Sequence, residues 1–215
     1  AVGANPSMKG AELGKIICDT YMEGCLREGT ERSDTLSLVD LGKLPVLNMT
    51  YNALGLEAVV KVMENESFYA AYGRQAKSAE NYMNSRSEGF TNMVDIGSLV
   101  RNLKWELPEF TQLMLDALDE AVIYKVSGPY RNPSGISCYY PFDGNSDGFK
   151  AMMDTGNVTS FLILNGLQLG FLDTDKAISY LERISAEISA ALEADEEGSE
   201  DNGPATPPSP SQSSG

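Results

Sequence analysis

Apolar residues recur along most of the chain at the three- and four-residue spacing of an amphipathic helix. The clearest pattern begins at Pro108 and predicts a helix that buries Phe110, Leu113, Met114, Ala117, Leu118, Ala121 and Val122. The first helix is predicted from an N-cap at Ser7 to about Arg27, with Leu13, Ile16, Ile17, Thr20, Tyr21 and Cys25 packed on a core. Weaker patterns predict helices at Pro45 to about Glu64, Ser67 to Asn84, Asp95 to Leu103, Phe149 to Met153, Thr159 to Leu169 and Asp175 to about Leu192.

Two segments have the composition of strands. Thr35 to Leu41 alternates apolar and polar residues and is interpreted as a short strand that passes into a helix. Gly135 to Phe142 is rich in β-branched and aromatic residues, and Pro141 ends it. Two short strands are too few to make a sheet alone. The pattern therefore predicts a helix-rich α/β fold whose sheet is completed by strands upstream of this chain.

The composition changes near the C-terminus. From Glu193 to Gly215 there are six acidic residues, no basic residue and four prolines among serines. Such a segment cannot bury enough apolar surface to fold and is typical of a disordered tail or linker. We therefore divide the chain into a folded part, residues 1–192, and an acidic Pro/Ser-rich tail, residues 193–215.

Charge and composition exclude several functional classes. The 215 residues contain 16 Lys and Arg against 31 Asp and Glu, a net charge of −15, and no histidine. Without an imidazole there is no Ser-His-Asp triad, Cys-His pair or His-ligated zinc site. The negative charge argues against nucleic acid as a partner, and no apolar run approaches the roughly 20 residues of a membrane span. The start at Ala1, without an initiator methionine or a signal peptide, indicates a piece of something longer.

The three cysteines match no metal or redox motif. Cys18 and Cys25 lie two helical turns apart, about 10 Å along the axis, which is too far for a disulfide. We interpret them and Cys138 as buried free thiols that act as small apolar residues.

One segment has the spacing of a calcium-binding loop. Asp143, Asn145 and Asp147, with Asp154 eleven positions after the first, match the oxygen-ligand positions of an EF-hand. Lys150 stands where such a loop is normally apolar, and the preceding element is predicted to be a strand rather than a helix. These departures favour an ordinary loop, with calcium as the alternative.

Other clusters have structural explanations. The carboxylates Asp116, Asp119 and Glu120 lie on the polar face of the Pro108 helix, which favours a solvated surface over a glycosidase-like acid pair. An aromatic group either packs in the core or lines a groove, and its helical spacing favours packing; its members are Phe68, Tyr69, Tyr72 and Tyr82. The basic residues Arg74, Lys77 and Arg86 are scattered and define no patch.

Four short segments, in order, resemble the C-terminal part of the clostripain family of cysteine endopeptidases. They are T-L-S-L-V-D-L-G-K-L (Thr35 to Leu44), N-M-V-D-I-G-S-L-V (Asn92 to Val100), A-L-D-E-A-V-I-Y-K (Ala117 to Lys125) and P-S-G-I-S-C-Y-Y-P-F (Pro133 to Phe142). With the opening helix S-M-K-G-A-E-L-G-K-I-I-C-D-T-Y, the resemblance covers about Ser7 to Phe142. It implies a caspase-like α/β sandwich with helical additions, a Cys-His dyad, cleavage after Arg or Lys, calcium dependence and export from a bacterial cell.

The chain departs from the family pattern at the catalytic centre. In the family the histidine and the nucleophilic cysteine, which follows an Asp-Ala pair, lie upstream of these segments, and none of the three cysteines here has that context. We therefore assign no catalytic, cofactor-binding or metal-ligating residue to this chain. The hypothesis is a C-terminal structural portion, inactive alone, whose partners are the upstream catalytic segment and a peptide or protein substrate. The alternative is a non-catalytic bacterial surface or secreted binding module that keeps the scaffold.

Overall fold

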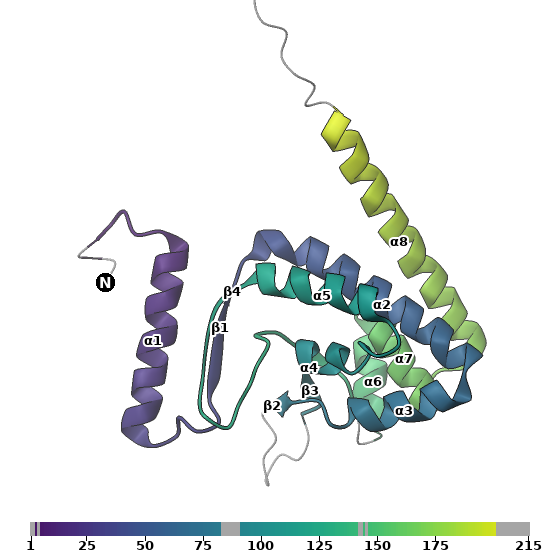
Figure 1. The fold of residues 1–215 in the computed structure, drawn as a ribbon, viewed down its shortest axis with the longest axis horizontal. Helices are drawn as coiled ribbons and strands as arrows, with labels where there is room; N and C mark the ends of the chain where they lie inside the picture. The colour runs from purple at the N-terminus through teal and green to yellow at the C-terminus, as the bar shows by residue number, and fades with distance from the viewer. Residues whose placement is uncertain (1–2, 4, 83–90, 142–143, 145, 201–215) are drawn as a thin grey trace, which may run out of the picture.

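The computed structural model describes residues 3, 5–82, 91–141, 144 and 146–200 (Figure 1). Within these residues the chain forms a mixed, helix-rich α/β fold. Its elements in order are α1 (Gly10–Glu28), β1 (Thr35–Val39), the short 3₁₀ helix η1 (Leu41–Lys43), α2 (Leu44–Glu64), α3 (Glu66–Ala76), β2 (Asn81–Tyr82), β3 (Met93–Asp95), α4 (Ile96–Arg101), α5 (Pro108–Ala121), β4 (Val122–Ser127), β5 (Ser137–Tyr139), α6 (Ser146–Asp154), α7 (Ser160–Leu169) and α8 (Thr174–Glu200).

The main core lies in a helical body, the name used here for α2 to α8 with the small sheet among them. In this body α2 packs against α5, α7, α3 and α8. Its fully buried side chains include Leu54, Tyr72, Leu99, Leu118 and Leu164. Helices α2 and α7 approach so closely that a β-carbon at Gly55 would overlap the Ser160 hydroxyl.

Local signals in the sequence explain where several helices begin. Pro45 stands in the first turn of α2, where its missing N–H is not needed. The side chain of Asn65 accepts hydrogen bonds from the backbone of Ser67 and Phe68 and so caps α3. Thr159 caps α7 in the same way through the Leu162 N–H. The capped helices therefore start where their exposed amides find a side-chain acceptor.

The strands form two separate antiparallel sheets. In the first, β1 pairs with β4 from Thr35–Ser127 to Val39–Val122, with an irregularity between Leu38 and Val39. The second has the order β2-β3-β5 and pairs Met93 with both Tyr82 and Tyr139. We call the β1–β4 pair the ribbon. Figure 1 shows the ribbon between α1 and the helical body, so that α1 stands on its far side.

The structure corrects the prediction of two short strands, because the described residues form five. The predicted strand at Thr35 to Leu41 is confirmed as β1, and that at Gly135 to Phe142 is confirmed in part as β5. The helix predicted to run to Asn84 ends at Ala76, and β2 follows it. The segment after Ala121 is β4 because its β-branched and aromatic residues alternate and find a partner in β1.

The two terminal helices also differ from expectation. Helix α1 is capped at Lys9 rather than Ser7. Its predicted apolar face is not packed on a core, since Ile16, Ile17 and Tyr21 are 38%, 54% and 41% exposed. The last helix continues beyond Leu192 to Glu200, and residues 201–215 of the predicted tail lie outside the described residues. No helix in the described part of the chain is long and apolar enough to span a membrane.

Candidate functional site

The ribbon presents two unpaired edges. Each of its strands has a hydrogen-bonded neighbour on one side, and within the described residues neither is paired on the other. An exposed strand edge carries a row of free backbone donors and acceptors, which is a template for another strand. The ribbon is therefore the clearest incomplete element of this fold.

Helix α1 covers one face of the ribbon. It approaches β1 so closely that a β-carbon at Gly14 would overlap the Leu38 side chain. The Tyr124 hydroxyl donates a hydrogen bond to Asp19, and the Lys15 ammonium lies 4.9 Å from the Tyr124 ring centroid. The hydrogen bond to Asp19, which stabilises the protonated phenol, raises the pKa of Tyr124. These contacts hold α1 on the ribbon, while Ile16, Ile17 and Tyr21, here called the α1 flank, stay exposed.

A cavity of about 310 Å³ lies beside β1. Its wall includes the three consecutive β1 residues Thr35, Leu36 and Ser37, whose side chains alternate between the two faces of the strand. The opposite wall is the segment from Pro133 to Ser137, with Tyr82 and Met93. Because residues from both faces line it, the cavity runs along the edge of β1 rather than over one face.

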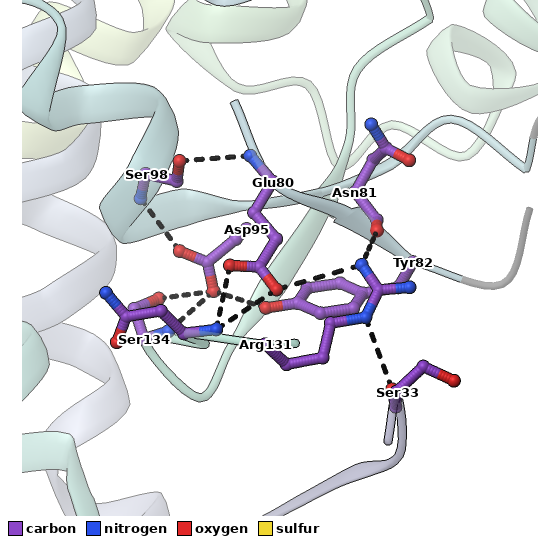
Figure 2. A network of polar contacts seen from close by, with 9 residues as sticks. Ser33, Glu80, Asn81, Tyr82, Asp95, Ser98, Arg131 and Ser134 are labelled. Atoms are coloured by element: carbon purple, nitrogen blue, oxygen red, sulfur yellow. Dashed lines mark hydrogen bonds and ion pairs between the residues drawn. The ribbon is translucent and has the colours of Figure 1, made fainter. Parts of the chain in front are cut away.

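A buried carboxylate organises the wall of this cavity (Figure 2). Asp95 is 0% exposed and accepts four hydrogen bonds. The Ser98 N–H donates to Oδ1 at 2.7 Å, which caps α4. The Ser134 N–H, the Ser134 hydroxyl and the Tyr82 hydroxyl donate to Oδ2 at 2.7, 2.9 and 2.9 Å. Burial is the main cause, followed by the Asp95 charge, of a raised pKa at Tyr82, which keeps this phenol a donor.

A second polar layer ties the same wall to the start of the ribbon. The Arg131 guanidinium donates to the carbonyls of Ser33 and Asn81, at 3.2 and 2.9 Å. It lies 3.7 Å from the Glu80 carboxylate and 5.6 Å from the Tyr82 ring centroid. In Figure 2 this layer and the Asp95 cluster form one continuous network. With its lone pairs taken by four donors, Asp95 acts as a structural anchor rather than a general base.

The cysteines are not arranged as nucleophiles. All three are free thiols, with Cys18 and Cys25 buried and Cys138 partly buried. Burial raises the pKa of the Cys138 thiol to about 11, and burial also raises the pKa of Cys18. A nucleophilic cysteine needs a lowered pKa and a neighbouring base. The Tyr51 hydroxyl, 3.3 Å from the Cys138 sulfur, is a phenol whose own pKa is raised by burial.

The carboxylates on the Pro108 helix, α5, lie on its exposed face, as the solvated-surface interpretation predicts. Asp116 accepts a hydrogen bond from Gln112, and Glu120 pairs with Lys43 at 2.9 Å. Of the aromatic group, Phe68 and Tyr72 are buried in the core, which confirms the packing interpretation for these two.

The calcium alternative falls mostly outside the described residues. Asp143 and Asn145 are not among them, whereas Asp147 and Asp154 lie on α6. Among the residues that are described, no group of three or more metal-binding side chains comes together.

Comparison with known proteins identifies no relative. No protein-family model matches the chain, and neither a curated protein nor a solved structure matches it.

Sequence reasoning missed the Asp95 network. The only local signal is the N-cap pattern of Asp95 followed three residues later by Ser98. The partners Tyr82, Arg131 and Ser134 come from distant segments, and polar residues before a proline or glycine look like any turn.

Proposed function

We propose that this chain is the C-terminal, non-catalytic portion of a clostripain-like cysteine endopeptidase, and that it completes the sheet of an upstream segment that carries the Cys-His dyad. The observation that carries the proposal is the ribbon with its two unpaired edges. A two-stranded antiparallel pair is marginally stable by itself and is normally part of a larger sheet. The family is inferred from the four sequence segments, two of which contain the ribbon strands.

The cavity beside β1 supports strand addition at that edge. It follows three consecutive residues of the strand and is bounded by a wall that the Asp95 and Arg131 network makes rigid. Strand addition satisfies the free backbone groups of an edge and uses alternate side chains for specificity. An upstream strand entering here would pair with β1 and extend the ribbon into a three-stranded sheet.

The α1 flank supports the same conclusion. Ile16, Ile17 and Tyr21 belong to the apolar face that the sequence pattern marks for burial, and they are exposed in this structure. Burying apolar surface stabilises a complex by roughly 25 cal/mol per Å². A segment that adds strands to the ribbon would also have the opportunity to cover this flank.

Chemistry supports a supporting rather than a catalytic role. The chain contains no histidine, and the thiols of Cys18 and Cys138 have raised pKa values. Activity of the complete protein would therefore depend on groups contributed by the upstream segment.

The test is hydrolysis of fluorogenic peptides with Arg or Lys before the scissile bond, by the chain alone and by the chain co-expressed with its natural upstream segment. We expect activity only in the pair, and its loss when an upstream cysteine is replaced by Ala. The variant Ile17→Asp, on the α1 flank, should weaken the association of the two parts at least tenfold. Ile178→Asp is the matched control, because Ile178 on α8 is also exposed, at 39%.

Two outcomes would contradict the proposal. One is a well-folded pair without peptidase activity, which would favour the non-catalytic binding module. The other is equal association of the Ile17→Asp and Ile178→Asp variants, which would remove the α1 flank from the interface.

A further inference from the structure

A second cavity, of about 240 Å³, lies between α3 and α7. Figure 1 shows these helices in the part of the body away from α1 and the ribbon. Helix α3 contributes Tyr69, Gly73 and Arg74 to its wall, Lys77 follows at the end of that helix, and Pro141 closes the cavity on another side. The cavity shares no residue with the ribbon or α1, so a ligand bound in it is independent of the endopeptidase proposal.

One polar side chain of the cavity wall has an unused acceptor. Asn165 is 2% exposed, and its Nδ2 donates a hydrogen bond to the Pro141 carbonyl at 2.9 Å. Because a carbonyl only accepts, this contact fixes which end of the amide is the donor. Its Oδ1 is buried and has no hydrogen-bond partner in the described structure. Unsatisfied buried acceptors are uncommon in folded proteins and call for a partner.

The neighbouring Gln168 has an unused donor. The Tyr140 hydroxyl lies 3.0 Å from the Gln168 Oε1 and 3.0 Å from the Tyr72 hydroxyl. A chain in which Tyr72 donates to Tyr140, and Tyr140 donates to Gln168, uses each hydroxyl proton once. The Gln168 Nε2 is then left buried without an acceptor in the described structure, beside Gly73, where no side chain intervenes. Asn165 and Gln168 together offer one acceptor and one donor, the complement of a peptide group.

Two cations stand at the same cavity. Arg74 and Lys77 are three residues apart, are exposed, and form no ion pair in the described part of the chain. The sequence pattern alone treats them as scattered, but α3 and its C-cap place both on one wall. In a chain with a net charge of −15, two unpaired cations beside an amide pair favour an anionic ligand. Arginine in particular matches the planar geometry of a carboxylate.

We propose that the cavity between α3 and α7 binds a short peptide that carries a carboxylate. The carboxylate pairs with Arg74 and Lys77, and one peptide group donates its N–H to the Asn165 Oδ1 and accepts from the Gln168 Nε2. The peptide comes from another molecule, because α8 carries the acidic segment of this chain away from α3 (Figure 1).

Binding is tested with the full chain by isothermal titration calorimetry against four probes. Acetyl-Ala-Glu-Ala-amide offers a side-chain carboxylate, and acetyl-Ala-Ala offers a C-terminal one. Acetyl-Ala-Gln-Ala-amide lacks the charge, and glutarate lacks the peptide group. We expect one of the two carboxylate peptides to bind at least tenfold more tightly than the uncharged peptide and glutarate, and that peptide identifies the source of the carboxylate.

Two variants separate the two halves of the site. Arg74→Gln with Lys77→Gln should weaken binding of the preferred peptide at least tenfold, whereas the control, Lys104→Gln with Lys150→Gln, makes the same charge change away from the cavity and should not. Gln168→Glu keeps the acceptor for Tyr140 but replaces the free donor by an oxygen, and should also lose at least tenfold. Circular dichroism shows whether each variant is folded, and Ala70→Trp, at an exposed position of the wall, blocks the cavity without touching a buried group.

Several results would overturn the proposal. Absence of binding by any peptide at millimolar concentration would do so, as would equal binding of the Glu and Gln peptides. Equal binding of glutarate would reduce the cavity to a plain anion site. Unchanged affinity in the folded Arg74→Gln, Lys77→Gln variant or in Ala70→Trp would place the ligand elsewhere.

Discussion

The helical body and the α1–ribbon end use similar apolar residues with different results. In the body, Leu54, Leu99 and Val100 are 0% exposed, and α2 is surrounded by other helices. At the other end, Ile17 is 54% exposed, and α1 packs against only the two strands of the ribbon among its close neighbours in the described structure. The comparison teaches that the body is a self-sufficient core, whereas the α1–ribbon end is an interface that awaits a partner.

The largest expected effect contrasts one residue from each region. Leu54→Ala, in the centre of α2, should lower the free energy of unfolding by about 2–5 kcal/mol, because it removes buried methyl groups and leaves a cavity. Ile17→Ala should change it by less than about 0.5 kcal/mol in the isolated chain, since the side chain is already in water. Urea unfolding followed by Trp105 fluorescence, the only tryptophan and a residue of the body, measures both. Similar losses in the two variants would break the comparison.

A smaller effect is expected at the junction of the two regions. Asp95→Asn keeps the shape of the side chain but replaces an acceptor oxygen by a donor, against four buried or partly buried donors. We expect a loss of about 2–4 kcal/mol in the free energy of unfolding. Hydrogen exchange should show the ribbon amides losing protection before those of α2.

The exposed Asp116→Asn serves as the control for Asp95→Asn, since it makes the same chemical change on the outer face of α5. Equal effects of the two substitutions would mean that the Asp95 network does not hold the junction together.

The smallest expected effect is a pH dependence of the body. Burial raises the pKa of Cys138 from about 9 to about 11. Between these values the unfolded chain has released a proton that the folded chain keeps, so the free energy of unfolding falls as the pH rises. The loss should be on the order of 2 kcal/mol by pH 11. Urea unfolding with Trp105 fluorescence at pH 8 to 11 measures it, and Cys138→Ala should flatten the slope below pH 10.

Cys18 extends this measurement to the other region, because burial also raises the pKa of its thiol and it lies on α1. If Cys18→Ala, and not Cys138→Ala, flattened the slope seen by Trp105, the two regions would unfold as one unit and the contrast between them would be lost.

Part of the fold follows from local patterns. The 3.6-residue period and Pro45 place α2, and the same period with Pro108 places α5, almost to the residue. Strand β1 follows from its alternation. The start of β4 was predicted as a continuation of α5, because Val122 also fits the helical period and only pairing with β1 decides between the two. The strands β2 and β3, at two and three residues, are too short to produce a pattern.

The sequence by itself determined the helix-rich character of this chain, the absence of histidine and the lack of an activated cysteine context. These properties depend on residue identity and on neighbours within a few positions. Only the tertiary structure decided that Asp95 is shared by three segments, that Arg74 and Lys77 stand beside the amides of Asn165 and Gln168, and that the apolar side of α1 is left uncovered. Such features depend on contacts between residues tens of positions apart, whose distance and burial are set by packing rather than by local propensity.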